Sequence, residues 1–582
     1  MASLAVLAWG RALSAVELRR RRLEGSPSGW PATVHPVLQQ IYAARGVLTP
    51  LEAEHRLARM LSPQTLGGID RAVDLLVEAI RGDWSILIAG DYDCDGATGT
   101  AVAIRGLRML GARRVDYAIP NRFVHGYGLS PAFVASMQPS PQLIVTVDNG
   151  VASVAGVATA RARGIRVIVT DHHLPGEQLP DCDAMVNPNL RGDPFPSKML
   201  AGVGVMFYLL LALRARLHGQ GAFAERKPDL SSLLDLVALG TVADLVPLDF
   251  NNRVLVEAGL QRMRLGRGCA GIVALVEAGK RSMATLVASD LGFAVGPRLN
   301  AAGRLEDMRL GVECLLADDT AQARRCAEQL DAINLERRDL QASMVAEAEQ
   351  MVAGLTDIDA IGVALYEPSW HAGVVGLVAS KLKDRLHRPV IAFAPASEDD
   401  TQHLRGSARS IAGFHVRDAL AAIDARQPGL IERFGGHAMA AGLSLRAEDY
   451  PRFAAAFDAI ARELIAAERL QALLYTDGEL PPGAATLALA RQLRLAGPWG
   501  QAFPEPLFDN LFDCASWKLM GERHLRLQLR DPRDGSMHDA VMFNAWHGQP
   551  PPARLRAAYE LTVNDWQGRE SPRLLLRHIE PA

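Results

Sequence analysis

Three short runs rich in valine and isoleucine constrain this chain more than any other feature. They occupy residues 85–90, 143–147 and 165–170, and a helical pattern follows them. This alternation predicts parallel strands of an α/β sheet. Acidic or imidazole side chains follow directly at the ends of these runs: Asp91, Asp93, Asp95, Asp148, Asp171, His172 and His173. Because ligands of parallel sheets bind beyond the carboxyl ends of the strands, we expect these side chains to lie at one edge.

Carboxylate oxygen and imidazole nitrogen at one sheet edge indicate a site for divalent cations such as Mg²⁺ or Mn²⁺. Asp93 and Asp95 can each hold one of two cations about 3.5–4 Å apart, and Asp148 can bridge them. The alternative is a calcium loop, whose acidic spacing this turn resembles. A calcium loop requires flanking helices and a later bidentate Glu, whereas an apolar run precedes the acids here. A hydrolytic two-metal site is therefore the better interpretation.

Cysteine usage and the ends of the chain bear on its cellular location. The six cysteines are widely spaced and form no CxxC pair, which predicts reduced thiols of a cytosolic protein. Cys94 lies among hard oxygen ligands and is not expected to bind metal. The sequence has no apolar run long enough for a membrane span, and its N-terminus places apolar residues before arginines, unlike a secretory signal. We expect a cytoplasmic protein, with an organelle-targeting peptide as the alternative.

A chain of 582 residues exceeds the usual size of one domain, so we expect three or more. Residues up to about 80 have helical patterns, including a helix opened by Thr49 and Pro50 that continues through Leu61. Strands and helices alternate from 84 to 187, helices dominate 199–290, and a glycine-rich stretch at 291–307 predicts a loop.

An apolar stripe at residues 321–353 predicts a long helix that packs on both neighbouring domains. Its members are Cys326, Leu330, Ile333, Leu340, Met344 and Met351. A second α/β unit follows and ends near Gly442. From about Tyr475, short alternating stretches predict a small β-barrel or sandwich.

Several segments together resemble the RecJ family of single-stranded-DNA exonucleases, within the DHH phosphoesterase superfamily. They are GDYDCDG (90–96), PNRFVHGYG (120–128), TVDNG (146–150), TDHH (170–173), ADLVPL (243–248) and GPRLNAAGR (296–304). In addition, FGGHAMAAG (434–442) resembles the signature of the DHH-associated domain. The position before Gly90 departs from the pattern, because it is Ala89 where relatives often carry His.

The resemblance implies an α/β fold with five parts. They are an N-terminal helical extension (1–70), a parallel-sheet DHH catalytic domain (71–318), a connecting long helix (319–355), a second α/β, DHH-associated domain (356–465) and a C-terminal OB-like β-barrel that binds nucleic acid (466–582).

The resemblance also implies roles for individual residues. The metal ligands would be Asp91, Asp93, Asp95, Asp148, Asp171, His172 and Asp244. The residues implied in catalysis are Asp93, Asp95, Asp148, His172 and His173, with His173 facing the phosphate. Nucleic acid and phosphate would be bound by Arg122, Tyr127, Arg298, Asn300, Arg304, Ser407, Arg409, Gly435, Gly436 and His437.

Arginine in glycine-marked loops suits phosphate because its planar guanidinium donates paired hydrogen bonds. If Ser407 and Arg409 capture a terminal 5′-phosphate while the metals cut one linkage away, cleavage must proceed 5′ to 3′. Tyr127, His125 and Trp370 are further candidates for base stacking, and a packing role is equally expected for each. The same two interpretations apply to the aromatic residues of the barrel, which are Trp517, Phe543, Trp546 and Trp566.

The implied activity is Mn²⁺- or Mg²⁺-dependent hydrolysis of single-stranded DNA to 5′-mononucleotides in recombination and repair. We expect a monomer that works with a helicase and a single-strand-binding protein. Two alternatives stay open at this point. One is a DHH phosphoesterase for pyrophosphate, short oligonucleotides or cyclic dinucleotides, and the other is a non-catalytic DNA-binding scaffold. The net charge of −3 supplies no global field for nucleic acid, so any basic groove must be local.

Overall fold

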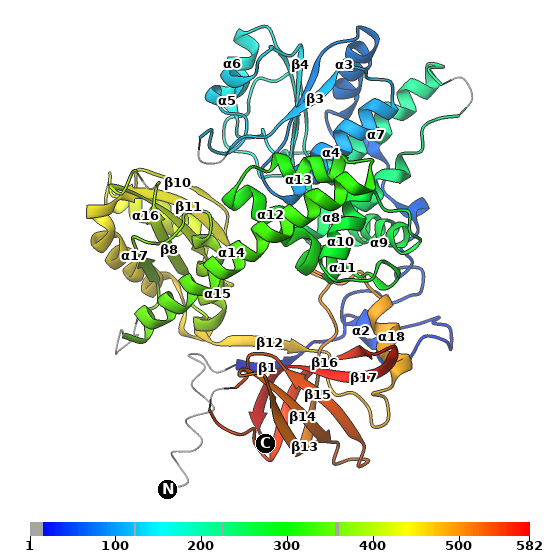
Figure 1. The fold of residues 1–582 in the computed structure, drawn as a ribbon, viewed down its shortest axis with the longest axis vertical. Helices are drawn as coiled ribbons and strands as arrows, with labels where there is room; N and C mark the ends of the chain where they lie inside the picture. The colour runs from blue at the N-terminus through cyan, green and yellow to red at the C-terminus, as the bar shows by residue number, and fades with distance from the viewer. Residues whose placement is uncertain (1–15, 122–123, 224–225, 355–359, 398, 547) are drawn as a thin grey trace.

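The computed structural model describes residues 16–121, 124–223, 226–354, 360–397, 399–546 and 548–582. Two α/β lobes are joined by a long helix, and a β-barrel lies at the end of the molecule opposite the first sheet (Figure 1). The predicted α/β class with a C-terminal barrel is confirmed.

Five parallel strands form the first sheet, in the order β3-β2-β4-β5-β6. The strands are β2 (Ile86–Ala89), β3 (Val115–Ala118), β4 (Leu143–Val147), β5 (Arg166–Thr170) and β6 (Ala184–Val186). The surrounding helices are α3 (Ile69–Arg81), α4 (Cys94–Met109), α5 (Pro131–Ser136), α6 (Val154–Ala162) and α7 (Gly202–Gly219). Every residue of β4 is buried, as expected for a strand covered on both faces.

Alternate side chains of these strands enter two different cores, because successive residues of a strand point to opposite faces. Ile88 and Val145 pack with α3, α4 and α7. Ile144 and Val167 pack with α5 and α6 on the other face. The apolar runs of the sequence therefore serve both layers of helices.

A helical layer follows the sheet and lies between it and the barrel (Figure 1). It comprises α8 (Leu234–Ala243), α9 (Phe250–Arg264), α10 (Ala270–Ala278), α11 (Ala288–Asp290), a π-helical segment (Leu291–Val295), α12 (Gly296–Leu305) and α13 (Arg309–Leu316). The prediction of a loop at 291–307 was wrong, since most of it is helical. A Cβ at Gly303 would lie 1.8 Å from the carbonyl oxygen of Tyr92, so this glycine permits close helix packing.

The predicted connecting helix is α14 (Thr320–Gly354). Its 35 residues correspond to a length of about 52 Å. The apolar stripe enters the first core through Ala327 and Leu330 and a separate core of the second lobe through Met344 and Ala348. One continuous helix thus fixes the spacing of the two lobes.

The second lobe contains a mixed sheet in the order β10-β11-β9-β8-β7. Its strands are β7 (Val363–Tyr366), β8 (Val390–Pro395), β9 (His403–Arg409), β10 (Arg433–Gly436) and β11 (Ala440–Arg446). Its helices are α15 (Val375–Leu386), α16 (Val416–Arg426) and α17 (Tyr450–Leu464).

The barrel is closed, with the strand order β13-β14-β15-β17-β16. Its strands are β13 (Phe508–Met520), β14 (His524–Arg530), β15 (Met537–Met542), β16 (Arg554–Trp566) and β17 (Arg569–Pro581), and α18 (Leu487–Leu495) precedes them. The connection from the second lobe includes β12 (Ala472–Thr476) (Figure 1). Among the described residues, no helix combines the length and the apolar character needed to cross a membrane.

The N-terminal segment differs from the helical prediction. It contains β1 (Val16–Arg20), which pairs in parallel with β12, and α2 (Pro36–Ala43). The helix expected to continue through Leu61 is absent from the described chain, where only a 3₁₀ turn at Leu57–Arg59 forms. Tertiary contacts explain the difference, because His55 accepts a hydrogen bond from Arg253 and Arg59 lies over the ring of Phe250.

Candidate metal centre

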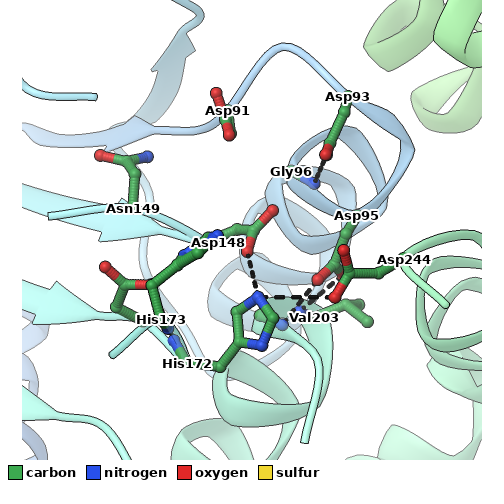
Figure 2. Close-up of polar contacts among 12 residues, drawn as sticks. Asp91, Asp93, Asp95, Gly96, Asp148, Asn149, His172, His173, Val203 and Asp244 are labelled. Atoms are coloured by element: carbon green, nitrogen blue, oxygen red, sulfur yellow. Dashed lines mark hydrogen bonds and ion pairs between the residues drawn. The ribbon is translucent and has the colours of Figure 1, made fainter. Parts of the chain in front are cut away.

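The acidic and imidazole side chains converge beyond the carboxyl ends of β2, β4 and β5, as the strand pattern predicts (Figure 2). Asp244 joins them from the C-terminal end of α8. Three overlapping groups among the described residues bring their ligand atoms within 4.8 Å of one another. The groups are Asp91 with Asp93 and Asp148, Asp95 with His172 and Asp244, and Asp148 with His172 and His173. Asp148 and His172 each belong to two groups and so connect them.

Local backbone geometry holds the acids in place. Asp93 caps the N-terminus of α4, where its Oδ1 accepts the Gly96 amide at 2.9 Å. Asp95 lies two residues later, in the first turn of α4, and its oxygens accept the amides of Gly202 at 2.6 Å and Val203 at 3.0 Å. The N-terminus of α7 thus orients Asp95, which is favourable because helix N-termini attract negative charge.

Asp148 adopts a left-handed backbone conformation with φ of 64°. Asp and Asn tolerate this region better than most residues, and such outliers gather at functional sites. A Cβ at Gly202 would lie 2.5 Å from the Cβ of Asp148. Glycine at position 202 therefore allows α7 to begin directly against the central carboxylate.

Two buried atoms make this site suitable for a cation. The Nε2 of His172 lies 3.1 Å from Oδ1 of Asp148 and 3.5 Å from Oδ2 of Asp244. Within the described structure, Nε2 of His172 and Oδ1 of Asp148 are buried without a hydrogen-bond partner. Burial, together with the charge of His173, lowers the pKa of His172 to about 4. A neutral imidazole and a carboxylate directed at the same point suit a divalent cation.

The carboxylates repel one another in the absence of a cation. Burial, followed by the charge of Asp93, raises the pKa of Asp95 to about 7. Burial and the charge of Asp95 also raise the pKa values of Asp148 and Asp244 well above the ordinary range. Bound cations would offset both the repulsion and the cost of burial.

Asp171 has a different environment from the other acids. Its Oδ1 accepts the amides of His172 and His173 and lies 2.7 Å from Nδ1 of His173, and its Oδ2 accepts the Val151 amide. Asp171 belongs to none of the three groups with clustered ligand atoms among the described residues. Burial opposes ionisation, but the hydrogen bond and charge of His173, together with the backbone amides of Val151 and His173, outweigh it and lower the pKa of Asp171.

His173 is the positively charged group of the site. Burial favours its neutral form, but the hydrogen bond and charge of Asp171 raise the pKa of His173 to about 9. The hydroxyl of Tyr127 lies 3.4 Å from Nε2 of His173 and 3.4 Å from the carbonyl oxygen of Asp148. His173 is thus fixed as an imidazolium at the rim of the cluster.

The second lobe contributes an arginine without a carboxylate partner among the described residues. The Nη1 of Arg409 donates to Oγ of Ser407 at 3.0 Å, and burial lowers the pKa of Arg409. A Cβ at Gly376, near the start of α15, would lie 2.8 Å from Oγ of Ser407 and 2.9 Å from Nη2 of Arg409. The predicted pair lies on strand β9 and not in a loop. Ser407 and Arg409 lie against the N-terminus of α15, and such a position suits an anion.

The other residues expected to bind nucleic acid have varied surroundings. Asn300 accepts the Cys94 amide at 2.8 Å, which ties α12 to α4. Arg298 donates to the carbonyl of Ala278 and lies 2.7 Å from Asp331 of α14. Arg304 donates to the carbonyl of Gly373 in the second lobe. All three residues lie on α12, and each of these contacts is with another part of the protein.

The remaining candidates lie at or near the boundary of the two lobes. His437, exposed between β10 and β11, has its ring 6.2 Å from that of His173. Gly435 and Gly436 precede it on β10. Trp370 is buried and donates to Glu347, and His125 packs on Phe133, so packing explains both. Arg122 lies outside the described residues.

Sequence reasoning missed Asn149 as part of this site. Its Nδ2 donates to the carbonyls of Ala89 at 3.1 Å and Val147 at 2.9 Å, joining β2 to β4. Its Oδ1 is buried and has no hydrogen-bond partner within the described structure. The available signal was its position directly after Asp148 at a strand end (Figure 2).

Comparison with known proteins identifies the family. Three family models match the chain: "DHH family, N-terminal domain" at residues 85–241, "DHHA1 domain" at 359–463 and "RecJ OB domain" at 476–578. The single-stranded-DNA-specific exonuclease RecJ of Dickeya dadantii is 50% identical over 575 residues, covering 97% of this chain and 99% of that protein. The chain belongs to the RecJ family. The RecJ exonuclease of Escherichia coli is 48% identical over 576 residues, with the same coverage.

Solved RecJ structures show the same architecture. The crystal structure of RecJ from Thermus thermophilus in complex with Mn²⁺ matches with a TM-score of 0.79 at 30% identity, covering 97% of this chain and 80% of that one. The complex of RecJ from the same organism with Mg²⁺ matches with a TM-score of 0.75 at 29% identity, covering 98% and 79%. The RecJ fold therefore extends over all three matched domains.

Proposed function

We propose that this chain is a 5′ to 3′ exonuclease that hydrolyses single-stranded DNA to 5′-mononucleotides using two divalent cations, Mn²⁺ or Mg²⁺. The observation that carries the proposal is the buried cluster around Asp148 and His172, which fits a pair of cations. The names of the relatives support the substrate, since they are single-stranded-DNA-specific exonucleases.

The proposed cation ligands come from four segments of the chain: Asp91, Asp93, Asp95, Asp148, His172 and Asp244. Asp148 belongs to groups on both sides of the site and is the proposed bridging ligand. When bound, the cations polarise the phosphodiester and lower the pKa of an attacking water. Asp171 acts indirectly in this proposal, because it orients His173 and keeps it protonated. The resemblance implied that Asp171 is a metal ligand, so this proposal gives it a different role.

His173 supplies the proposed donor to the phosphate. Its imidazolium can donate a hydrogen bond to a phosphoryl or leaving oxygen, where negative charge develops. Tyr127 contacts both His173 and the backbone of Asp148, so it fixes the donor relative to the bridging ligand. No covalent intermediate is required.

The proposed direction of cleavage rests on Arg409. A partly buried guanidinium beside a serine hydroxyl and a helix N-terminus suits a terminal phosphate, which carries more negative charge than an internal phosphodiester. Arg409 of β9 pairs with Ala440 of β11, and the carbonyl of Ala440 accepts the His437 amide. The pocket and His437 thus lie on adjoining strands of the second lobe.

The barrel is the proposed contact for the strand beyond the cleavage site. Trp517 and Trp546 stack with ring centroids 5.6 Å apart, and Phe543 and Trp566 are exposed by 57% and 70%. Exposed aromatic side chains stack on bases with little sequence preference. The proposal further includes the cytoplasmic location, the monomeric state, the role in recombination and repair, and a helicase and a single-strand-binding protein as partners.

The test is digestion of end-labelled single- and double-stranded DNA with Mn²⁺ or Mg²⁺. Wild type should release mononucleotides from 5′-phosphorylated single strands and leave duplex and a dinucleotide largely intact. Arg409→Ala should lose the preference for a 5′-phosphate over a blocked end. Arg405→Ala is the matched control, because Arg405 is exposed on the same strand. Release from the 3′ end, or an unchanged end preference in Arg409→Ala, would contradict the proposed polarity.

A further inference from the structure

A hollow lies away from the metal centre, where the C-terminal end of α4 meets the start of α8. Its volume is about 390 Å³, within the range of small-ligand sites. The connection between α9 and α10 and the residues after α13 complete its wall. Neither the family resemblance nor the proposed nuclease mechanism gives this hollow a role.

Its wall carries four arginines and one aspartate. Arg105 is already engaged, because it pairs with Asp318 and donates to backbone carbonyls. Arg108, Arg262 and Arg267 form no ion pair within the described parts of the chain, although Arg108 donates one hydrogen bond to the carbonyl of Val115. The Nε of Arg262 is buried and lacks a hydrogen-bond partner there. The hollow therefore holds an excess of positive charge that its own carboxylate does not balance.

The rest of the wall is largely apolar. Met109, Leu233, Leu236 and Leu316 line it together with Ala270. This composition suits a ligand with a flat apolar part, since small-ligand sites combine an apolar wall with a few polar anchors.

A buried carboxyl group, that of Asp235, adjoins this region; burial raises its pKa, and the charge of Arg262 opposes that shift. Asp235 accepts the amides of Leu236 at 3.0 Å and Cys269 at 2.7 Å. Its two oxygens are thus engaged by backbone donors. The three arginines that form no ion pair keep their charge available to a ligand from outside.

We propose that this hollow binds a nucleoside phosphate. The phosphate groups would contact Arg108, Arg262 and Arg267, whose planar forks donate paired hydrogen bonds to such oxygens. The base would pack on the methionine and leucine side chains. An internal nucleotide of a DNA strand presents the same chemical groups. We assign the hollow to a free nucleotide.

The hollow and the metal centre share two helices. α4 is capped by Asp93 at the metal centre and carries Arg108 near its other end, and its 16 residues span about 24 Å. α8 begins at the hollow and ends at Asp244. Each helix carries a metal ligand at one end and wall residues at the other, so a shift of either helix on binding would reach the metal centre and change the rate of cleavage.

The test is equilibrium dialysis of ADP against the full-length protein in EDTA, with a short single-stranded oligonucleotide and inorganic phosphate as separate competitors. Arg108→Glu/Arg267→Glu should weaken ADP binding by about tenfold or more, since hydrogen bonds to charged groups are lost. Arg113→Glu is the matched control, because Arg113 is exposed beyond the end of α4 and outside the lining. Arg409→Ala is the control for binding at the phosphate pocket of the second lobe.

Binding lost in the double variant and retained in both controls supports the proposal. Absence of ADP binding to wild type, or binding lost only in Arg409→Ala, overturns it. An oligonucleotide that binds the hollow more tightly than ADP does, as judged by its displacement of ADP, would assign the hollow to the DNA strand and overturn the assignment to a free nucleotide. The coupling between the hollow and the metal centre is tested by nuclease rates with and without ADP at fixed free Mn²⁺. If ADP changes the rate equally in wild type and in the double variant, the proposed coupling is overturned.

Discussion

The imidazole rings of His173 and His437 lie nearly parallel, with centroids 6.2 Å apart and an interplanar angle of 16°. His173 follows a strand of the first lobe, and His437 lies on a turn of the second. Burial and the positive charge of His173 lower the pKa of His437. The two lobes therefore meet at the rim of the metal centre with one charged and one neutral imidazole.

The charge of His173 depends on Asp171, which gives the first prediction. Asp171→Asn removes the anion that raises the pKa of His173 to about 9, so this pKa should fall toward its ordinary value. We expect a 10- to 100-fold loss of activity, roughly the cost of removing a supporting partner, and the loss should grow between pH 7 and pH 9. The measurement is a pH profile of kcat/KM, with the exposed Asp181→Asn as control. A constant loss across this range would contradict the charged donor.

Proton competition at the metal ligands gives the second prediction. Because the pKa of Asp95 is about 7 and the pKa values of Asp148 and Asp244 are also raised well above the ordinary range, protons compete with cations at neutral pH. The affinity for Mn²⁺ should therefore increase as the pH rises from 6 to 8. Titration calorimetry at several pH values measures it. A pH-independent affinity would show that these carboxylates are already ionised.

The same raised pKa values govern the stability of the metal-free protein. A carboxyl group whose pKa is higher in the folded state contributes stability at low pH, and this contribution is lost as the pH rises through the folded-state pKa. In EDTA, Asp148→Asn should thus stabilise the protein at pH 8 by roughly 1–3 kcal/mol while abolishing cleavage. Asn suits this site because it tolerates the left-handed backbone at position 148. Chemical denaturation at pH 5.5 and pH 8 measures the effect, which should be smaller at pH 5.5.

Arg298 shows why the contacts of a residue cannot be predicted from its motif alone. Its motif suggests phosphate binding, yet its partners are carbonyls of α10 and the π-helical segment and Asp331 of α14. Arg298→Ala should lower the free energy of unfolding by roughly 1–3 kcal/mol, because partly buried charged groups lose their partners. Arg309→Ala, at an exposed position on α13, is the control. A loss of DNA affinity without loss of stability would contradict this structural role and support the phosphate-binding role predicted from the motif.

Local patterns predicted the strands and the acids because both depend on residues adjacent in the chain. The apolar alternation before Asp91 and Asp148 and the stripe of the long helix are signals of this kind. By contrast, β1 forms only because β12, near the other end of the chain, supplies its partner. The surroundings of Asp171 were also hidden, since the sequence does not report which donors lie around its carboxylate. Long-range partners decide such features, and neither periodicity nor spacing reports them.

The attachment of the N-terminal segment gives the last prediction. Arg45 and Asp477 form a buried pair, each side chain 2% exposed, with Nη1 and Oδ1 2.7 Å apart. A second hydrogen bond joins Nη2 to Oδ2, and the guanidinium lies over the ring of Trp499. Without Arg45, the side chain of the buried Asp477 retains, among the described residues, only Arg21 at 3.9 Å and the Leu507 amide at 3.0 Å, so Arg45→Ala should cost about 3 kcal/mol of unfolding free energy, the lower end of the range for a broken buried pair. Arg426→Ala, which breaks an exposed pair with Glu463, should cost far less. Equal losses in the two variants would show that the buried pair does not secure the N-terminal segment to the barrel connection.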